Sequence, residues 1–204
     1  MNDAHPQAQP QPPWLLPIPS PLSEHVLRAV YASDQAMYPV ALSYARLRAW
    51  VVASPALSVS FTIRDTATAT ATATDTDADT DVVGVIIVLP LRKVYWEQLL
   101  SGGVKEVDVD PGSMFPGVGM RACGEGFQGV DEGEVVREEV GLHVYHVEKF
   151  ATEDGSRGGD AMGWGVEKKR FAEFALDEVM RRVEGRREWK VVGLSGLCPS
   201  TFSF

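Results

Sequence analysis

The chain has 204 residues, of which 45% are hydrophobic, and its formal net charge at pH 7 is -9. This length and composition suit one globular domain with a core of its own. The negative charge disfavours nucleic acid as a partner, because phosphate backbones are repelled. Positively charged acceptors such as amines are attracted, though only weakly at physiological salt.

Neither cysteine framework nor targeting signal is visible. Cys123 and Cys198 are far apart and form no CxxC pair, so neither a disulfide scaffold nor a zinc finger is expected. The N-terminal residues lack the basic and apolar regions of a signal peptide. The longest apolar run, Val82 to Leu91, has about half the length needed to cross a bilayer. We therefore expect a cytoplasmic or nuclear protein without a membrane partner.

Two segments are low in complexity. Residues 1–21 are rich in Pro, Gln and Ala, which predicts disorder, although Trp14 to Leu16 could add a short edge strand. Residues 66–81 read TATATATATDTDADTD, which predicts a mobile hairpin loop. The folded domain is expected to span 22–204, with this insert inside it.

The first half of the domain predicts two helices and two strands. Apolar residues recur at helical spacing from Ser23 to Tyr38, where Ser23 suits the N-cap, and again from Ser43 to Ala53. Alternation over 59–63 predicts a half-buried strand. The β-branched run 82–89 predicts a strand buried on both faces and ended by Pro90.

The second half predicts a short helix followed by a strand, a helix and a strand. The short helix covers 95–100 and stops at Gly102-Gly103, and Val104 to Val109 is expected to be extended. The later elements are a strand over 140–145, a long helix over 166–183 and a last strand over 189–194. This order predicts an α/β (α+β, three-layer) domain with a mixed central sheet and a right-handed crossover.

This order of elements, together with several sequence stretches, resembles the GCN5-related N-acetyltransferase (GNAT) superfamily, in particular its fungal members. The resemblance spans residues 22–197 and is carried by the stretches YPVALSYARLRAW, VVGVIIVLPL, WEQLLSGGVKEVDV, GLHVYHVEKF and VVGLSGL. It implies a GNAT-like acyl-CoA N-acyltransferase fold that uses acetyl-CoA as co-substrate.

The resemblance also implies where acetyl-CoA would bind. The strand before the long helix would offer backbone groups to the pantetheine arm, from Val144, Tyr145 and Val147. Gly163, Trp164 and Gly165 precede the long helix, and unpaired N–H groups there would hold the pyrophosphate. The family has Arg or Gln where this chain has Asp160, and Arg157 or the lysines of the first helical turn could supply the positive charge. A flexible loop that only caps the helix is the alternative interpretation.

His146 and Glu148 are the candidate catalytic residues, because amine acetylation needs a base that takes a proton from the attacking ammonium. Alternation along a regular strand puts these two on one face and His143 on the other, so the three would not share a metal ion. No metal site is predicted. The alternative is that the histidines pack at the strand surface and Glu148 pairs with Lys149 or an arginine.

Other polar residues have two interpretations each. Glu106, Asp108 and Asp110 alternate with valines and could gather a cationic acceptor or a metal, or simply form a solvated strand face. Ser195 lies in Gly-Leu-Ser-Gly, which is similar to a nucleophile elbow but lacks its glycine spacing. A turn at the end of a strand is the simpler interpretation of that stretch.

The resemblance implies an acetyl-CoA-dependent N-acetyltransferase acting on a small-molecule or peptide amine. A catalytically inactive GNAT-fold binding or structural module is the alternative, favoured by Asp160 and by the short C-terminus. The family continues after the GLSGL-like strand with a helix and further strands, which are expected to be missing here. The last strand would then expose an edge near Val191, Leu194 and Leu197, which predicts self-association.

Overall fold

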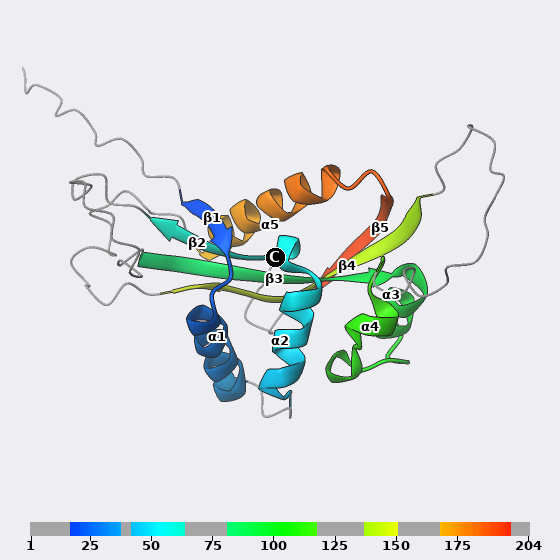
Figure 1. Cartoon of the computed structure of the whole chain (residues 1–204), viewed down its shortest axis with the longest axis horizontal. Coiled ribbons are helices and arrows are strands. Elements are labelled where there is room, and N and C mark those ends of the chain that lie inside the picture. Colours follow the sequence, from blue (N-terminus) through cyan, green and yellow to red (C-terminus); the bar gives the residue numbers. More distant parts are fainter. Residues whose placement is uncertain (1–16, 38–41, 64–80, 118–136, 151–167, 197–204) are drawn as a thin grey trace, which may run out of the picture.

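The computed structural model of the chain describes residues 17–37, 42–63, 81–117, 137–150 and 168–196 (Figure 1). The predicted disorder of the first residues, the edge strand at Trp14 to Leu16 and nearly all of the insert lie outside the described residues. Gly163, Trp164 and Gly165 also lie outside them. Among the described helices, none is long and apolar enough to span a membrane.

A five-stranded mixed sheet forms the centre of the domain, and its strands follow one another in chain order. They are β1 (Ile18–Pro21), β2 (Ser58–Ile63), β3 (Asp81–Arg92), β4 (Glu138–Lys149) and β5 (Trp189–Gly196). The pairs from β1 to β4 are antiparallel, whereas β5 is parallel to β4. The α/β class with a mixed sheet is therefore confirmed.

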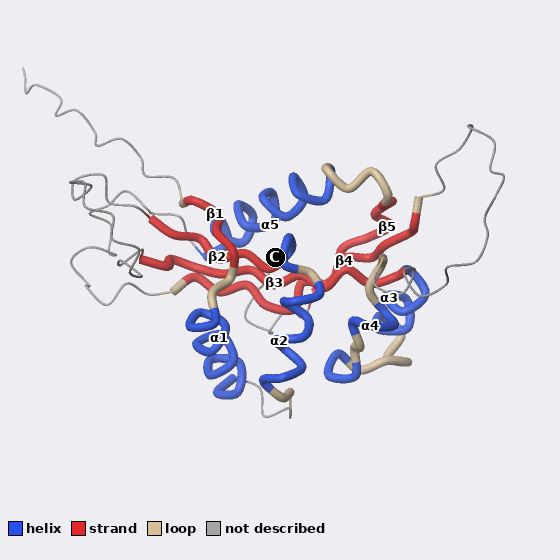
Figure 2. Tube along the Cα trace, viewed as in Figure 1, coloured by secondary structure: helices blue, strands red, loops and turns tan. Residues whose placement is uncertain are grey.

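Helices cover both faces of the sheet, which gives the three expected layers (Figures 1 and 2). On one face lie α1 (Glu24–Met37), α2 (Tyr44–Ala53), α3 (Lys93–Leu100) and the single turn α4 (Pro111–Met114). On the other face lies α5 (Lys168–Glu184). Short 3-10 turns at Pro55–Leu57 and Glu106–Asp108 complete the described elements.

Each face of the sheet has its own apolar core. Leu47 and Trp50 of α2 are fully buried against Ile87 and Leu89 of β3 on the α1/α2 face. On the α5 face, the buried residues of the helix that pack on the sheet are Phe171, Ala175, Val179 and Val183. Because β3 has a helix layer on each face, its side chains are apolar in both directions, as the continuous β-branched run predicts.

Pro90 does not end β3, which continues to Arg92, so the predicted boundary is wrong. Pro90 pairs with Leu142 of β4 on one side. On the other side, β2 pairs only as far as Ile87. Beyond that point β3 has an open edge among the described strands, and a proline without an N–H is tolerated there.

The segment after α3 is not extended, contrary to the prediction. Glu106–Asp108 forms a 3-10 turn, and the Asp110 side chain then accepts from the backbone N–H of Ser113 as the N-cap of α4. The buried indole of Trp50 donates to the carbonyl of Val109 at 2.8 Å. These contacts make Asp110 a helix cap and rule out a solvated strand face.

The disorder predicted for residues 1–21 is wrong for residues 18–21, which form a strand. The observed edge strand β1 pairs with β2 through Ile18 to Pro21, in spite of two prolines. The Ser20 hydroxyl lies 2.9 Å from that of Ser60, which adds a side-chain link to the short ladder. Prolines suit an edge strand because its outer N–H groups need no partner.

Candidate functional site

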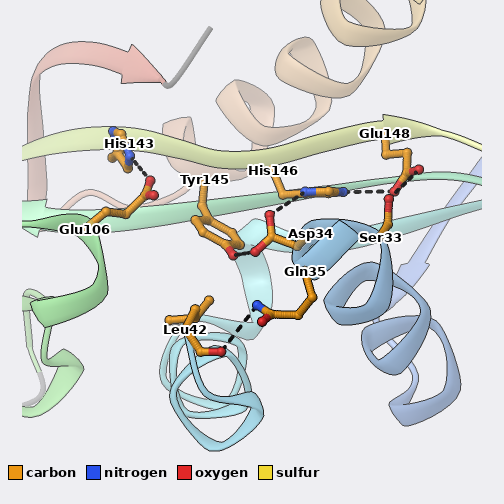
Figure 3. Close-up of polar contacts among 9 residues, drawn as sticks. All are labelled: Ser33, Asp34, Gln35, Leu42, Glu106, His143, Tyr145, His146 and Glu148. Carbon is orange, nitrogen blue, oxygen red and sulfur yellow. Dashed lines mark hydrogen bonds and ion pairs between the residues drawn. The ribbon is translucent and has the colours of Figure 1, made fainter. Parts of the chain in front are cut away.

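A β-bulge in β4 positions the polar side chains of the candidate site. Ile87 pairs with His146, but the next residue, Val88, pairs with Val144, so Tyr145 is an additional residue in β4. A bulge of this kind lets two consecutive residues point to the same face. His143, Tyr145, His146 and Glu148 consequently all contact residues of the α1/α2 face (Figure 3). The prediction that His143 lies on the opposite face is wrong for this reason.

Tyr145 is joined to a buried carboxylate of α1. Its hydroxyl donates to Asp34, which is 7% exposed (Figure 3). The ring of Tyr145 packs edge-on against Trp50. Burial first, and the hydrogen bond to Asp34 second, raise the pKa of Tyr145 far above its usual value. Tyr145 is therefore a neutral hydrogen-bond donor over the whole physiological pH range.

His146 and Glu148 do share one face, as predicted, and contact each other. Nε2 of His146 lies 3.1 Å from Oε2 of Glu148, and Nδ1 lies 4.0 Å from Oδ1 of Asp34. The other carboxylate oxygen of Glu148 accepts from the Ser33 hydroxyl at 3.1 Å (Figure 3). The side chain of His146 is 6% exposed and that of Glu148 is 28% exposed, so Glu148 is the member of the pair that an external molecule can reach.

The residues predicted to contact the cofactor through their backbone lie at the place where β4 leaves β5. The last pair between the two strands is Val144 with Gly196. β5 ends at this pair, so the described part of β5 does not cover this edge of β4 beyond Val144. The side chains of Val144 and Val147 point to the α5 face and pack in its core. The backbone edge of these residues is therefore next to His146 and Glu148, and a ligand bound along it would not displace the side chains of those two residues.

A second polar group lies two residues before Tyr145, the additional residue of the bulge. His143 is buried, with Nε2 2.6 Å from Oε1 of Glu106 and Nδ1 3.0 Å from the Ser195 hydroxyl. The indole N–H of Trp96 donates to the same hydroxyl at 2.9 Å. A pocket of about 460 Å³ borders this group. Another pocket, of about 420 Å³, is lined by Glu138 and Trp189 at the opposite end of β4, away from His146 and Glu148.

The sequence did not lead us to predict Asp34 or Ser33 as site residues, although the position of Asp34 in its helix could have indicated its role. It follows Leu27, Val30 and Tyr31 at helical spacing, so it occupies the apolar stripe of α1. A carboxylate in such a stripe must be paired, because burying an unpaired charge is unfavourable. The partner, Tyr145, is distant in sequence.

Within the described ranges, no three His, Cys, Asp or Glu side chains are grouped so that they could hold a metal ion. Cys123 lies outside those ranges.

Comparison with known proteins adds no assignment. No protein-family model matches the chain, and no curated protein is significantly similar to it.

Proposed function

We propose that the chain is an acetyl-CoA-dependent N-acetyltransferase whose acceptor is an amine of a small molecule or peptide. One observation carries the proposal. A strand edge that is open among the described residues begins at the bulge of β4 and lies beside a reachable carboxylate, Glu148, held by His146 and Ser33. The sequence resemblance and the sheet order support the same proposal.

The open edge of β4 suits the donor. The pantetheine arm of coenzyme A is extended and carries amides, and such a chain can add to a sheet edge as a strand does. We place it along 145–147, with the pyrophosphate toward Gly163 and Gly165 before α5. Backbone N–H groups near the bulge would support the oxyanion that forms when the thioester is attacked.

Glu148 is assigned the role of base, with His146 as the residue that positions it. The acceptor ammonium gives a proton to the Glu148 carboxylate, and the free amine attacks the thioester carbonyl carbon. The C–N bond forms first and gives a tetrahedral oxyanion, which collapses as the C–S bond breaks, and the leaving thiolate takes up the proton that the attacking nitrogen loses. Because the net charge of the chain is -9, a cationic amine is favoured near the site.

Two measurements test the proposal. Titration calorimetry should show micromolar binding of acetyl-CoA, and replacing both Gly163 and Gly165 by Val should abolish it while circular dichroism stays unchanged. An assay of thiol release with a panel of amines should detect turnover, which Glu148→Gln lowers about 100-fold. Glu173→Gln on the exposed side of α5 is the matched control and should leave turnover unchanged. Absence of binding by the folded protein would contradict the proposal.

The burial of Asp34 and His146 favours a second candidate function, a catalytically inactive binding or structural module. Asp34 and His146 are each 7% exposed, and their polar atoms are engaged with Tyr145 and Glu148. A satisfied buried network of this kind makes a fold rigid without any catalysis. Acetyl-CoA binding without thiol release for any amine of the panel would support this function over the enzyme.

A further inference from the structure

Ser195, His143 and Glu106 form a continuous hydrogen-bonded relay from three separate parts of the chain. Ser195 lies on β5, His143 on β4, and Glu106 in the 3-10 turn after α3. The serine oxygen is 3.0 Å from Nδ1 of His143, and Nε2 is 2.6 Å from the carboxylate. The sequence places the three residues far apart, and only the parallel pairing of β4 with β5, together with the turn after α3, brings them together.

The donors and acceptors of this relay give it a direction. The Trp96 indole can only donate, so the Ser195 oxygen accepts from it. Glu106, when ionised, can only accept, so Nε2 of His143 carries the proton that it receives. Nδ1 is then the unprotonated nitrogen and accepts the serine hydroxyl. A serine that donates to a histidine, itself oriented by a carboxylate, is the arrangement that activates a hydroxyl as a nucleophile.

The relay faces a space that a substrate can occupy. The pocket of about 460 Å³ is lined by Ser195, His143 and Glu106, and by apolar side chains that include Leu99, Leu100 and Val104. Lys105 lines it as well, and a cation near a reacting carbonyl favours the oxyanion that develops there. Apolar walls of this size suit a short acyl chain.

The surrounding structure holds the serine in place. Gly141 of β4 and Gly193 of β5 are paired across the strands, and a Cβ added at either would overlap with the Trp96 ring. The two glycines therefore let the indole lie directly on the sheet, where its N–H reaches Ser195. A residue oriented by this much neighbouring structure is held close to one geometry, as a nucleophile requires.

We propose that Ser195 is the nucleophile of a second site, which cleaves esters or thioesters of short acyl chains. The serine oxygen attacks the carbonyl carbon while its proton passes to Nδ1 of His143. The bond from the acyl carbon to the leaving oxygen or sulfur breaks, and the leaving group takes that proton. Water then attacks the acyl-serine, gives a proton to His143, and releases the carboxylic acid as the proton returns to Ser195.

Covalent labelling tests the site directly on the full chain. A fluorophosphonate probe should label Ser195, as identified by peptide mass spectrometry, and p-nitrophenyl acetate should be hydrolysed. Ser195→Ala should remove both signals, whereas Ser101→Ala, whose hydroxyl bonds only to helix carbonyls in the described structure, should change neither. Glu106→Gln should slow labelling about 100-fold, and Glu106→Asp should restore part of the rate.

These experiments distinguish a catalytic role of Ser195, His143 and Glu106 from a purely structural hydrogen-bond network. If the folded wild-type chain is not labelled at Ser195, or if Glu106→Gln is labelled at the wild-type rate, the proposal is overturned. Thermal melting of each variant shows whether the variant is folded, and labelling of the wild type decides the matter even if Ser195→Ala does not fold. Neither reagent contains coenzyme A, so these results are independent of the proposed acetyltransferase activity.

Discussion

The Tyr145 hydroxyl donates a hydrogen bond to the Asp34 carboxylate and so links β4 to α1 across the buried face of the sheet. Tyr145→Phe removes this donor and leaves a buried carboxylate with one partner fewer. We expect the free energy of unfolding to fall by about 1–3 kcal/mol, measured by urea denaturation. Tyr95→Phe, at a tyrosine of α3, is the control and should change stability by much less.

The same pair predicts how stability changes at high pH. The pKa of Tyr145 is raised in the folded state above its ordinary value of 10.0, so folding favours the protonated phenol. The resulting stabilisation is complete below pH 10 and is lost as the pH rises above that value toward the folded pKa. Unfolding free energies measured between pH 8 and pH 11 should fall more steeply for the wild type than for Tyr145→Phe. Equal slopes would show that the phenol is not buried as described.

Glu139 should make the folded protein less stable as the pH falls, the opposite of the effect expected for Tyr145. Its carboxylate lies 2.7 Å from Nζ of Lys190 and 2.8 Å from Nζ of Lys93, and these hydrogen bonds lower its pKa to about 2. The stabilisation is present above the ordinary value of 4.5 and is lost as the pH falls toward 2. The melting temperature of Glu139→Gln should therefore decline less than that of the wild type between pH 5 and pH 2. Added salt should reduce the difference, because the three side chains are partly exposed.

Gly141 and Gly193 are predicted to tolerate no side chain. Gly141→Ala places a methyl group where the Trp96 indole lies, so the ring must move away from Ser195. We expect a loss of about 1–3 kcal/mol in unfolding free energy and a red shift of tryptophan emission. At Gly103 the nearest atom would be 3.5 Å from an added Cβ, so Gly103→Ala is the control with little change. A wild-type melting curve for Gly141→Ala would refute this packing.

The Thr-Ala-Asp insert is predicted to be dispensable for the fold. Ile63 pairs with Asp81, so the strand ends on both sides of it are adjacent, and its composition offers few large apolar groups for packing. Replacing residues 67–80 by two glycines should leave the melting temperature the same or slightly higher, since a shorter loop is closed at a lower entropic cost. A drop of many degrees in a calorimetric scan would show that the insert packs on the domain.

β5 is the outermost described strand on its side of the sheet, and Leu194 is 48% exposed on it. Such an edge invites pairing with a second chain. We expect sedimentation velocity to show association at tens of micromolar protein, and Leu194→Lys to shift the distribution toward monomer. Val52→Lys, at an exposed apolar residue of α2, is the control. A wild-type monomer across this concentration range would exclude association through β5.

Local sequence patterns predicted most helices and strands, whereas the polar clusters needed tertiary structure. The apolar spacing in α1 and α2 and the alternation in β2 depend on nearby residues, and these elements lie close to their predicted bounds. The bulge at Tyr145 depends on how β4 pairs with β3, which periodicity along β4 does not contain. His143 consequently faces Glu106, and the face predicted for it from regular alternation is wrong.

The two boundary errors have the same origin. Pro90 is compatible with β3 only because β2 ends before it, and in the segment before α4 the carbonyl of Val109 accepts from the distant indole of Trp50. Neither neighbour can be identified from the residues of the segment itself. Asp34 is different, since the residues of α1 alone are enough to place it in the apolar stripe of that helix.

The position of β4 between an antiparallel and a parallel neighbour has a consequence for the order of folding. Its pairs with β3, such as Val85 with Glu148, and with β5, such as Val140 with Val191, all join residues far apart in the chain. Closing loops of this length is slow compared with forming local helices. The β4–β5 pair additionally needs the crossover through α5, so we expect β5 to join the sheet after β3 and β4 have paired. Substitutions in β5 should then act mainly on the unfolding rate and leave the refolding rate nearly unchanged.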